Sequence, residues 1–335
     1  MLLHKVSILI PFKNTAKYLH DCLNSITNQS YQNWEAIIVD DGSTDQSYKV
    51  VQSFTKIDNR IQLLSNKGQG IIDALKTAYE NSTGNYITRM DSDDVMQKSK
   101  IECMANDLNL NGQGFIALGL VEYFCETGIK EGYKRYEQWL NKLISTATNF
   151  NEIYKECVIP SPCWMVHRSD FEKANGFNSD TYPEDYDLAF RFFEIGLKCL
   201  PSNKVLHFWR DYPSRTSRTS PNYAENNFLN LKLEYFLKLS YKTQKKIVVW
   251  GAGKKGKKLV KLLIKAEVPF IWVCDNPKKI GKKIYNQQIK SWSRLSDISN
   301  SQSIITVANK NAQHKIKAVF KAQKKQAMRD YFFFC

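Results

Sequence analysis

Short apolar runs alternate with amphipathic stretches through the first hundred residues. Four runs rich in apolar and β-branched residues are typical of buried strands, and the stretches between them repeat apolar positions at a helical spacing. The strand-like runs are Val6–Ile10, Glu35–Val39, Ile61–Leu64 and Tyr86–Met90, and the helix-like stretches are Tyr18–Gln29, Gln46–Lys56 and Ile71–Glu80. This alternation predicts βαβ units and an α/β fold with a mostly parallel sheet.

The pattern is less regular between residues 110 and 240 and then starts again. Here we predict helices over Tyr136–Ile144, Asp185–Ile195 and Tyr223–Leu239, with a strand over Val205–Trp209. The polar segment 239–246 is expected to be a linker. Further strands and helices follow it, in residues 246–263, 269–276 and 303–320, before an apolar terminus at 331–335. We therefore predict two domains, residues 1–240 and residues 241–335.

The charge of the chain divides at the same place. Residues 1–240 hold 26 Lys and Arg against 29 Asp and Glu, whereas residues 241–335 hold 22 against 4, which gives −3 and +18. A basic domain of this kind suits an anionic membrane surface, or it is simply a soluble lysine-rich surface. Nucleic-acid binding is not favoured, because the lysines are not interleaved with aromatic residues and no recognition motif is present.

Other features of the sequence limit the class of protein. The chain has no run of about 18 apolar residues, as a membrane span would need. Its N-terminus does not resemble a secretory signal, because His4 and Lys5 interrupt the apolar residues. The eight cysteines form no CxxC pair and no metal-ligand spacing. These observations predict a protein of the reducing cytoplasm.

Two clusters of carboxylates follow predicted strands. Asp40 and Asp41 follow the second strand, and three aspartates within residues 91–94 follow the fourth. Ligands bind beyond the carboxyl ends of parallel strands, so both clusters are expected at one site. A helix cap needs only one such residue, and a calcium loop would need glycine where Met96 stands. A divalent cation shared with substrate phosphates is the remaining alternative to a capped turn.

Four motifs follow one another along the chain: VSILIPFKN, IIVDDGSTDQS, YITRMDSDD and PSPCWMVHRSDFEKANGFNSDTYPEDYDLAFRFFEIG. In this order they resemble the motifs of the family 2 glycosyltransferases, which have the GT-A fold, and the resemblance covers about residues 4–220. It implies an inverting transferase that takes a sugar from a nucleotide-diphosphate donor, expected to be a UDP-sugar. The implied acceptor is a hydroxyl of a saccharide or lipid-linked saccharide, in the synthesis of a surface polysaccharide or glycolipid.

The resemblance also implies roles on the donor side. Asp93 would be the principal ligand of Mn²⁺ or Mg²⁺, and Asp91 would face this metal or the ribose. Asp41 would hydrogen-bond the base, with Asp40 beside it, although Asp40 has the alternative role of a turn residue. Arg89 would be a partner for the donor or for these acids. All the donor-binding positions implied in this way are Pro11, Asp40, Asp41, Arg89, Asp91 and Arg210.

The acceptor side is implied by the motif EDYDL. In the resemblance Asp185 is the general base and Glu184 holds or tunes it, although acidic residues are also common in the first turn of a helix. Inverting transfer needs one carboxylate to take the proton of the attacking hydroxyl. A metal on Asp93 would meet the charge of the departing diphosphate.

The resemblance weakens after residue 200. Tyr212 stands where family members often have a histidine that reaches the metal, so the third metal ligand is not identified. His207 lies on the predicted strand and is expected to be a core residue. Arg210, Arg215 and Arg218 would bind the diphosphate as a lid, or they belong to a solvated basic loop.

The basic C-terminal part resembles small Rossmann-type domains appended to bacterial sugar-processing enzymes. Gly251, Gly253 and Gly256 fit G-x-G-x-x-G between a strand and a helix, and Asp275 ends the next strand. These four residues mark a possible second nucleotide site, with a structural or docking domain as the alternative. Two other functions stay open: an NAD-dependent oxidoreductase built on this domain, and a basic module that binds nucleotide, membrane or nucleic acid.

Overall fold

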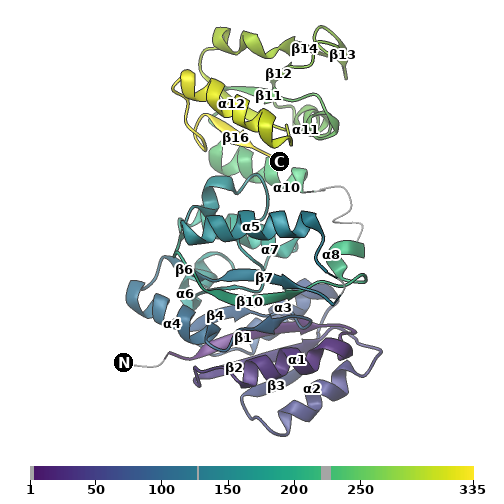
Figure 1. Cartoon of the computed structure of the whole chain (residues 1–335), viewed down its shortest axis with the longest axis vertical. Coiled ribbons are helices and arrows are strands. Elements are labelled where there is room, and N and C mark those ends of the chain that lie inside the picture. Colours follow the sequence, from purple (N-terminus) through teal and green to yellow (C-terminus); the bar gives the residue numbers. More distant parts are fainter. Residues whose placement is uncertain (1–3, 127, 220–227) are drawn as a thin grey trace. The chain divides into compact units, whose positions relative to one another are not determined.

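The computed structural model describes residues 4–126, 128–219 and 228–335 (Figure 1). The chain forms two compact units, one of Met1–Phe150 and Val158–Arg215 and the other of Asn151–Cys157 and Thr216–Cys335. Each unit is described by itself. This division lies earlier in the chain than the predicted boundary between residues 240 and 241, which stays a prediction.

The first unit is built on a seven-stranded sheet with the strand order β3-β2-β1-β4-β8-β6-β9. Its first four strands in chain order pair in parallel, whereas β8 is antiparallel to both β4 and β6. The strands are β1 (Val6–Phe12), β2 (Trp34–Asp40), β3 (Ile61–Ser65), β4 (Tyr86–Arg89), β6 (Phe115–Leu118), β8 (Trp164–His167) and β9 (Lys198–Cys199). The four strands predicted in this region are confirmed.

A second, three-stranded sheet and a set of helices complete the first unit. The small sheet has the order β5-β10-β7, with β5 at Val95–Met96, β7 at Leu120–Phe124 and β10 at Val205–Arg210. The helices are α1 (Ala16–Thr27), α2 (Ser47–Thr55), α3 (Gly70–Glu80), α4 (Lys100–Asn111), α5 (Glu131–Ser145), α6 (Arg168–Lys173) and α7 (Glu184–Glu194), and a 3₁₀ turn covers Asn149–Glu152. The helices predicted around α1, α2, α3, α5 and α7 are confirmed.

The position of β1 at the centre of the large sheet brings the acidic segments together. All seven residues of β1 are buried, as expected of a mostly apolar strand at the centre of a parallel sheet. The register places Phe12 opposite Asp40 on β2 and Leu9 opposite Arg89 on β4. The two loops that follow β2 and β4 therefore leave the same edge of the sheet, on either side of β1.

The second unit contains a six-stranded sheet of order β13-β14-β12-β11-β15-β16. The sheet is mixed, because β13 is antiparallel to β14 at one edge while the other pairs are parallel. Its strands are β11 (Lys246–Trp250), β12 (Phe270–Cys274), β13 (Lys283–Ile284), β14 (Gln287–Ser291), β15 (Ser301–Ile305) and β16 (Tyr331–Phe333). The expected α/β alternation is confirmed, whereas kinship with Rossmann-type domains stays a prediction.

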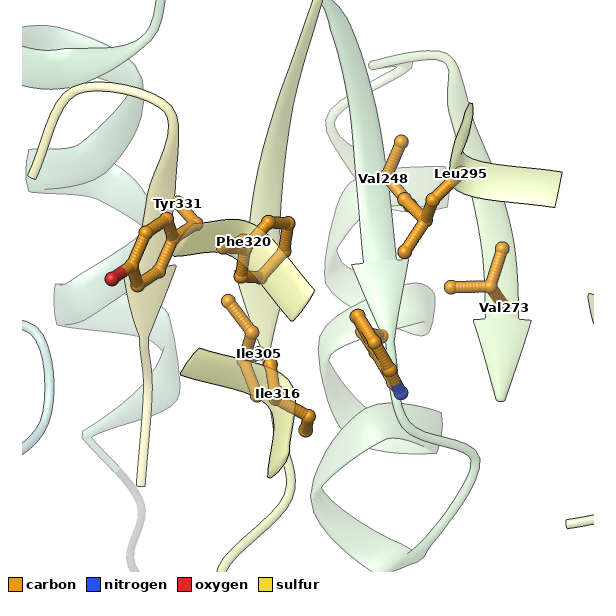
Figure 2. Packing of buried hydrophobic residues seen from close by; sticks show 8 residues of the cluster. Val248, Val273, Leu295, Ile305, Ile316, Phe320 and Tyr331 are labelled. Atoms are coloured by element: carbon orange, nitrogen blue, oxygen red, sulfur yellow. The ribbon is translucent and has the colours of Figure 1, made fainter. Parts of the chain in front are cut away.

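The second unit also contains helices and two short helical turns. They are α8 (Thr216–Thr219), α10 (Leu229–Tyr235), α11 (Lys254–Lys265), α12 (Lys310–Ala322), a π-helical turn at Phe236–Ser240 and a 3₁₀ turn at Trp292–Asp297. Figure 2 shows a core in which Ile316 and Phe320 of α12 lie with Val248 and Ile305 of the sheet. No helix of the described residues is long and apolar enough to cross a membrane.

The segment predicted as a linker, 239–246, is bound to the second unit. The side chain of Gln302 donates to the carbonyl of Ser240 (2.8 Å) and accepts from the backbone N–H of Lys242 (2.8 Å). Of the helix predicted over Tyr223–Leu239, residues 223–227 lie outside the described residues, and the remainder forms α10 and the π-helical turn. The polar segment 239–246 is therefore a bound part of the second unit and not a free linker between domains.

Candidate active site

The residues predicted after β2 lie at the carboxyl edge of the large sheet. Asp41 is held firmly, because its Oδ1 accepts from the side-chain amide of Asn66 (2.7 Å) and the backbone N–H of Gly70 (2.8 Å). Asp40 accepts from the backbone N–H of Ser43 (3.0 Å), which supports its role in the turn. Pro11 is buried in β1 nearby, paired in register with Val39 of β2. The structure thus brings Pro11, Asp40 and Asp41 together, and their contacts with a donor nucleotide stay predictions.

The acidic turn, residues 91–94, divides its carboxylates between two tasks. Asp94 is fully buried, and both of its carboxylate oxygens are occupied. Its Oδ1 accepts from the backbone N–H of Arg210 (2.8 Å), and its Oδ2 lies 3.0 Å from Nε2 of His207. Asp94 therefore fixes the turn to β10, and the other two carboxylates are left to face a ligand.

A buried histidine and lysine stand behind Asp94. His207 is fully buried on β10, as expected of a core residue, and its Nδ1 lies 3.3 Å from Nζ of Lys100. Lys100, at the start of α4, is also fully buried and donates to the carbonyl of Pro162. Burial and the neighbouring Lys100 hold the pKa of His207 well below its usual value. A neutral His207 then accepts from Lys100 through Nδ1 and donates to Asp94 through Nε2.

Asp91 and Asp93 form a donor set that suits a hard divalent cation. Asp91 accepts from Arg89 at Oδ1 alone (2.9 Å), and Asp93 accepts from Tyr212 at Oδ2 alone (2.8 Å). Each carboxylate thus keeps one oxygen that receives no hydrogen bond from the described part of the chain. Burial and the carboxylate of Asp94 raise the pKa of Asp93 to about 7, which a nearby cation would reverse.

Asp91 and Asp93 alone do not complete the coordination shell of a cation. Among residues 4–126, 128–219 and 228–335, no group of three or more His, Cys, Asp or Glu side chains is arranged to hold a metal ion. Mg²⁺ and similar ions are often held by one or two carboxylates together with substrate phosphates. The residues present therefore fit a cation shared with a phosphate-bearing ligand.

The end of β10 and the residues that follow it contact the acidic turn. Arg210 donates from Nε to the carbonyl of Asp93 (2.8 Å) and pairs with Asp21 on α1 (2.8 Å). Arg215 lies 3.9 Å from Asp94, with only 13% of its side chain exposed. These contacts are incompatible with a solvated loop for Arg210 and Arg215. Arg218 lies in α8, which is assigned to the second unit, and its part in binding the diphosphate stays a prediction.

Arg89 joins the two halves of the predicted site. It is almost fully buried, and it donates to Asp91 (2.9 Å) on one side and to Glu184 (2.8 Å) on the other. Although burial alone would lower the pKa of Arg89, the carboxylates of Asp91 and Glu184 outweigh this effect and raise it. A single permanently charged guanidinium thus ties the acidic turn to the first residue of α7.

Asp185 is the second residue of α7 and sits beside this bridge. Its Oδ1 accepts from the backbone N–H of Tyr186 (2.7 Å), and the residue is only half-buried. Burial and the adjacent Glu184 carboxylate raise the pKa of Asp185 to about 7. A partly exposed carboxylate with a pKa close to neutrality has the properties of a general base.

Sequence reasoning missed several residues that support the site. The roles of Asp94 and Lys100 had no sequence signal, because their partners lie more than a hundred residues away along the chain or on another element. Tyr212 was noted only as a departure from the family's histidine. Its hydroxyl donates a hydrogen bond to Asp93, the residue predicted as the principal metal ligand.

Removal of the Tyr212 hydroxyl should weaken cation binding. In Tyr212→Phe the hydrogen bond that orients Asp93 is lost, and outer-shell changes of this kind cost about 10–100-fold in metal affinity. We expect such a loss in a calorimetric titration with Mn²⁺ and UDP. Tyr18→Phe is the matched control, because the Tyr18 ring packs on Tyr212 at 4.6 Å, whereas the hydrogen bond to the Asp93 carboxylate comes from Tyr212. Equal affinities for the wild type and Tyr212→Phe would contradict the proposed role.

Replacement of Arg89 should destabilise the whole first unit. In Arg89→Met the buried Glu184 loses its cationic partner, and breaking a buried ion pair from one side costs about 3–5 kcal/mol. The free energy of unfolding in urea measures this loss. Lys67→Met is the control, because its ion pair with Glu80 is largely exposed and such pairs contribute about 0–1 kcal/mol. Similar losses in the two variants would show that the Arg89 bridge has no special weight.

The glycine-rich turn of the second unit has the geometry that its motif requires. Gly251 follows β11 with φ +126°, and a Cβ at Gly256 would lie 2.0 Å from the Gly251 carbonyl oxygen, so both positions need glycine. Gly253 precedes α11 with open space around it, and Asp275 is exposed after β12. Nucleotide binding by these four residues stays a prediction.

Comparison with known proteins identifies the family of the chain. The family model described as glycosyl transferase family 2 matches residues 7–174. Glycosyltransferase GlyA of Streptococcus pneumoniae is 27% identical over 220 residues, which are 64% of this chain and 32% of that protein. A protein of Haemophilus influenzae named as an uncharacterized glycosyltransferase is 32% identical over 203 residues, 57% of this chain and 61% of its own. The chain thus spans less than two thirds of the length of these relatives.

Solved structures support the same conclusion at the level of the fold. Staphylococcus aureus TarS, in complex with UDP-GlcNAc, matches with a TM-score of 0.53 at 16% identity, over 77% of this chain and 71% of that one. This likeness confirms the predicted GT-A fold. Since the family model covers half of the chain, from the first strand to the end of α6, the chain belongs to glycosyltransferase family 2.

Proposed function

We propose that the chain is an inverting glycosyltransferase that uses a nucleotide-diphosphate sugar, most simply a UDP-sugar. The observation that carries this proposal is the Arg89 bridge, which holds the acidic turn and the start of α7 together within one site. Membership of the family supports it, as does the likeness in fold to TarS, whose structure was solved with UDP-GlcNAc. An oxidoreductase centred on the second unit would leave this site without a role.

On the donor side, Asp91 and Asp93 would hold Mn²⁺ or Mg²⁺ through the oxygens that accept no hydrogen bond from the described residues. When bound, such a cation neutralises charge that develops on a departing diphosphate. A mannosyltransferase of Pyrobaculum calidifontis, which shares the fold with a TM-score of 0.50 at 19% identity, was solved with GDP-Man and Mn²⁺. In the proposal, Pro11, Asp40 and Asp41 receive the nucleoside, and Arg210 steadies the turn that receives the phosphates.

On the acceptor side, Asp185 would take the proton from the acceptor hydroxyl. The hydroxyl oxygen then forms its bond to the anomeric carbon as the bond between that carbon and the diphosphate oxygen breaks, and the diphosphate leaves with the electron pair. Attack opposite the leaving group inverts the anomeric configuration. Glu184 does not compete for this proton, because it is committed to Arg89.

A calorimetric titration with UDP tests the donor assignment. The expected result is binding of UDP in the presence of Mn²⁺ and loss of that binding when EDTA replaces the metal, with GDP as the control nucleotide. Binding of GDP and not UDP would leave the assignment as a glycosyltransferase intact, but it would change the proposed donor to a GDP-sugar. Absence of binding for both nucleotides, with a folded protein, would overturn the proposal.

The proposal extends to the acceptor and to the place of action. Chondroitin synthase of Escherichia coli is 30% identical over 212 residues, which are 60% of this chain and 29% of that protein. The relatives of this chain thus include a polysaccharide synthase. We propose a saccharide or lipid-linked saccharide acceptor for a surface polysaccharide or glycolipid. Such an acceptor would be met in the cytoplasm, with a peripheral contact between the basic second unit and the membrane.

A further inference from the structure

The larger part of the second unit, residues 241–335, has far more positive charge than the acids of this segment neutralise. Residues 241–335 contain 22 Lys and Arg but only four acidic residues. Two of these acids are already paired within the unit: Asp330 with Lys245 at 3.0 Å, and Asp297 with Arg294 at 3.2 Å. The excess charge must therefore be met by solvent, salt or an anionic partner.

Apolar side chains are exposed among these lysines on one part of the unit. Ile264 on α11 is 40% exposed, and Tyr285 in the β13–β14 turn is 41% exposed. Lys261 lies with its Nζ 4.9 Å from the centre of the Tyr285 ring, so the helix and the hairpin are neighbours. Ile264 and Lys265 follow Lys261 by three and four residues, and they share its face of α11.

The surface that these elements form is defined by six residues and is called here the helix–hairpin surface. It consists of Lys261, Ile264, Lys265, Lys282, Lys283 and Tyr285, all of them exposed. None of its four lysines forms an ion pair within the described ranges of the chain. Tyr285 and the next residue, Asn286, both have positive φ (+53° and +59°), a conformation that suits Asn or Gly and is uncommon for an aromatic residue. A tyrosine is thus kept at the tip of the hairpin against its backbone preference.

We propose that the helix–hairpin surface binds the anionic surface of a lipid bilayer. Each lysine close to such a surface strengthens binding about fivefold, and tyrosine is enriched where a bilayer meets water. The long apolar stems of the lysines can lie against the apolar part of the bilayer surface while their charged ends stay in water. Exposed Ile264 distinguishes this partner from nucleic acid, which would leave an aliphatic side chain facing water. The proposal deepens the proposed function, because it assigns to these six residues the membrane contact of the second unit that was proposed there.

Co-sedimentation of the full chain with vesicles tests this inference, in the absence of donor and acceptor. We expect binding to vesicles of phosphatidylcholine mixed with phosphatidylserine, weakening as salt is raised, and no binding to phosphatidylcholine alone. The triple variant Lys261→Gln, Lys265→Gln, Lys283→Gln should bind about a hundredfold more weakly. The matched control, Lys310→Gln, Lys315→Gln, Lys321→Gln on α12, removes the same charge from exposed positions and should lose little.

The apolar part of the surface needs its own variant. Ile264→Ser with Tyr285→Ser should reduce vesicle binding severalfold even at high salt, whereas Ile57→Ser, at a 79% exposed position of the first unit, should not. An equal loss of vesicle binding in the two triple lysine variants would contradict the helix–hairpin surface, because it would show that only the total charge matters. Binding of polyuridylate but not of vesicles would overturn the membrane partner. Because no donor is present, either failure leaves the transferase assignment intact.

Discussion

Asp93→Asn is expected to abolish metal-dependent binding of the donor nucleotide. The substitution keeps the shape of the side chain, and the Tyr212 hydroxyl still finds an oxygen, but the negative charge opposite the cation is gone. Since changes behind a metal ligand already cost about 10–100-fold in affinity, loss of a ligand charge should cost about a hundredfold or more. A calorimetric titration of UDP with Mn²⁺ measures the loss directly.

The control for Asp93→Asn is a carboxylate that has no part in the site. Asp180→Asn removes an acid whose side chain is 85% exposed and pairs with Lys76, so its UDP and Mn²⁺ affinities should match those of the wild type. Thermal unfolding without metal separates a local effect from loss of the fold. If Asp93→Asn binds UDP with Mn²⁺ as tightly as Asp180→Asn does, Asp93 is not a metal ligand.

The aspartates of the acidic turn have different roles, and only part of this difference could be predicted from the sequence. The alternation of strands predicted that the clusters after β2 and β4 would share one edge, and the parallel pairing of β1 with both strands brings this about. The pattern Asp-Ser-Asp-Asp did not reveal that Asp94 turns inward. That depends on β10, which pairs with β5 and carries His207 into contact across more than a hundred residues of chain.

Arg89 illustrates the same limit from another side. The sequence predicted it as a partner for the donor or for nearby acids, and the structure gives it Asp91 and Glu184. The second of these partners, 95 residues away, was itself predicted to belong to the acceptor side. The link between the two sides could not be predicted, because only tertiary packing decides which buried acid a buried arginine meets.

The limits of the two units were the least predictable feature of the fold. Composition and charge change near residue 240, yet the structure places α10 and residues 151–157 with the C-terminal part. The reason lies in aromatic packing, in which Tyr154 contacts Phe236 at 5.8 Å and stacks on Phe334 at 5.5 Å. The sequence of residues 151–157 alone gives no indication that this segment belongs to the second unit.

Asp185→Asn is expected to stop sugar transfer while donor binding stays intact. The amide cannot accept the proton of the acceptor hydroxyl, and general base catalysis contributes about 10²–10⁴-fold to the rate. Because the asparagine still accepts from the backbone N–H of Tyr186, the start of α7 should keep its shape. We expect kcat to fall by this factor and the UDP affinity to stay within about twofold, a change of no more than about 0.4 kcal/mol.

The matched control lies at the other end of the same helix. Glu194→Gln removes an exposed carboxylate from the last turn of α7 and should leave kcat unchanged. Turnover is measured as release of UDP with the donor at saturation. Full turnover by Asp185→Asn would exclude this residue as the base, and a parallel loss of UDP affinity would show that it acts on the donor instead.

The pH dependence of the wild-type enzyme gives an independent test of Asp185. Burial and the Glu184 carboxylate raise its pKa to about 7, so the base is ionised above this pH and protonated below it. Activity should therefore fall as the pH is lowered through about 7, tenfold for each further unit, because only the ionised form accepts a proton. Glu184→Gln removes the neighbouring negative charge, which should lower the pKa of Asp185 and move this limb of the profile to lower pH. A base outside this pair would leave the limb in place, so the direction of the displacement assigns the titration to Asp185.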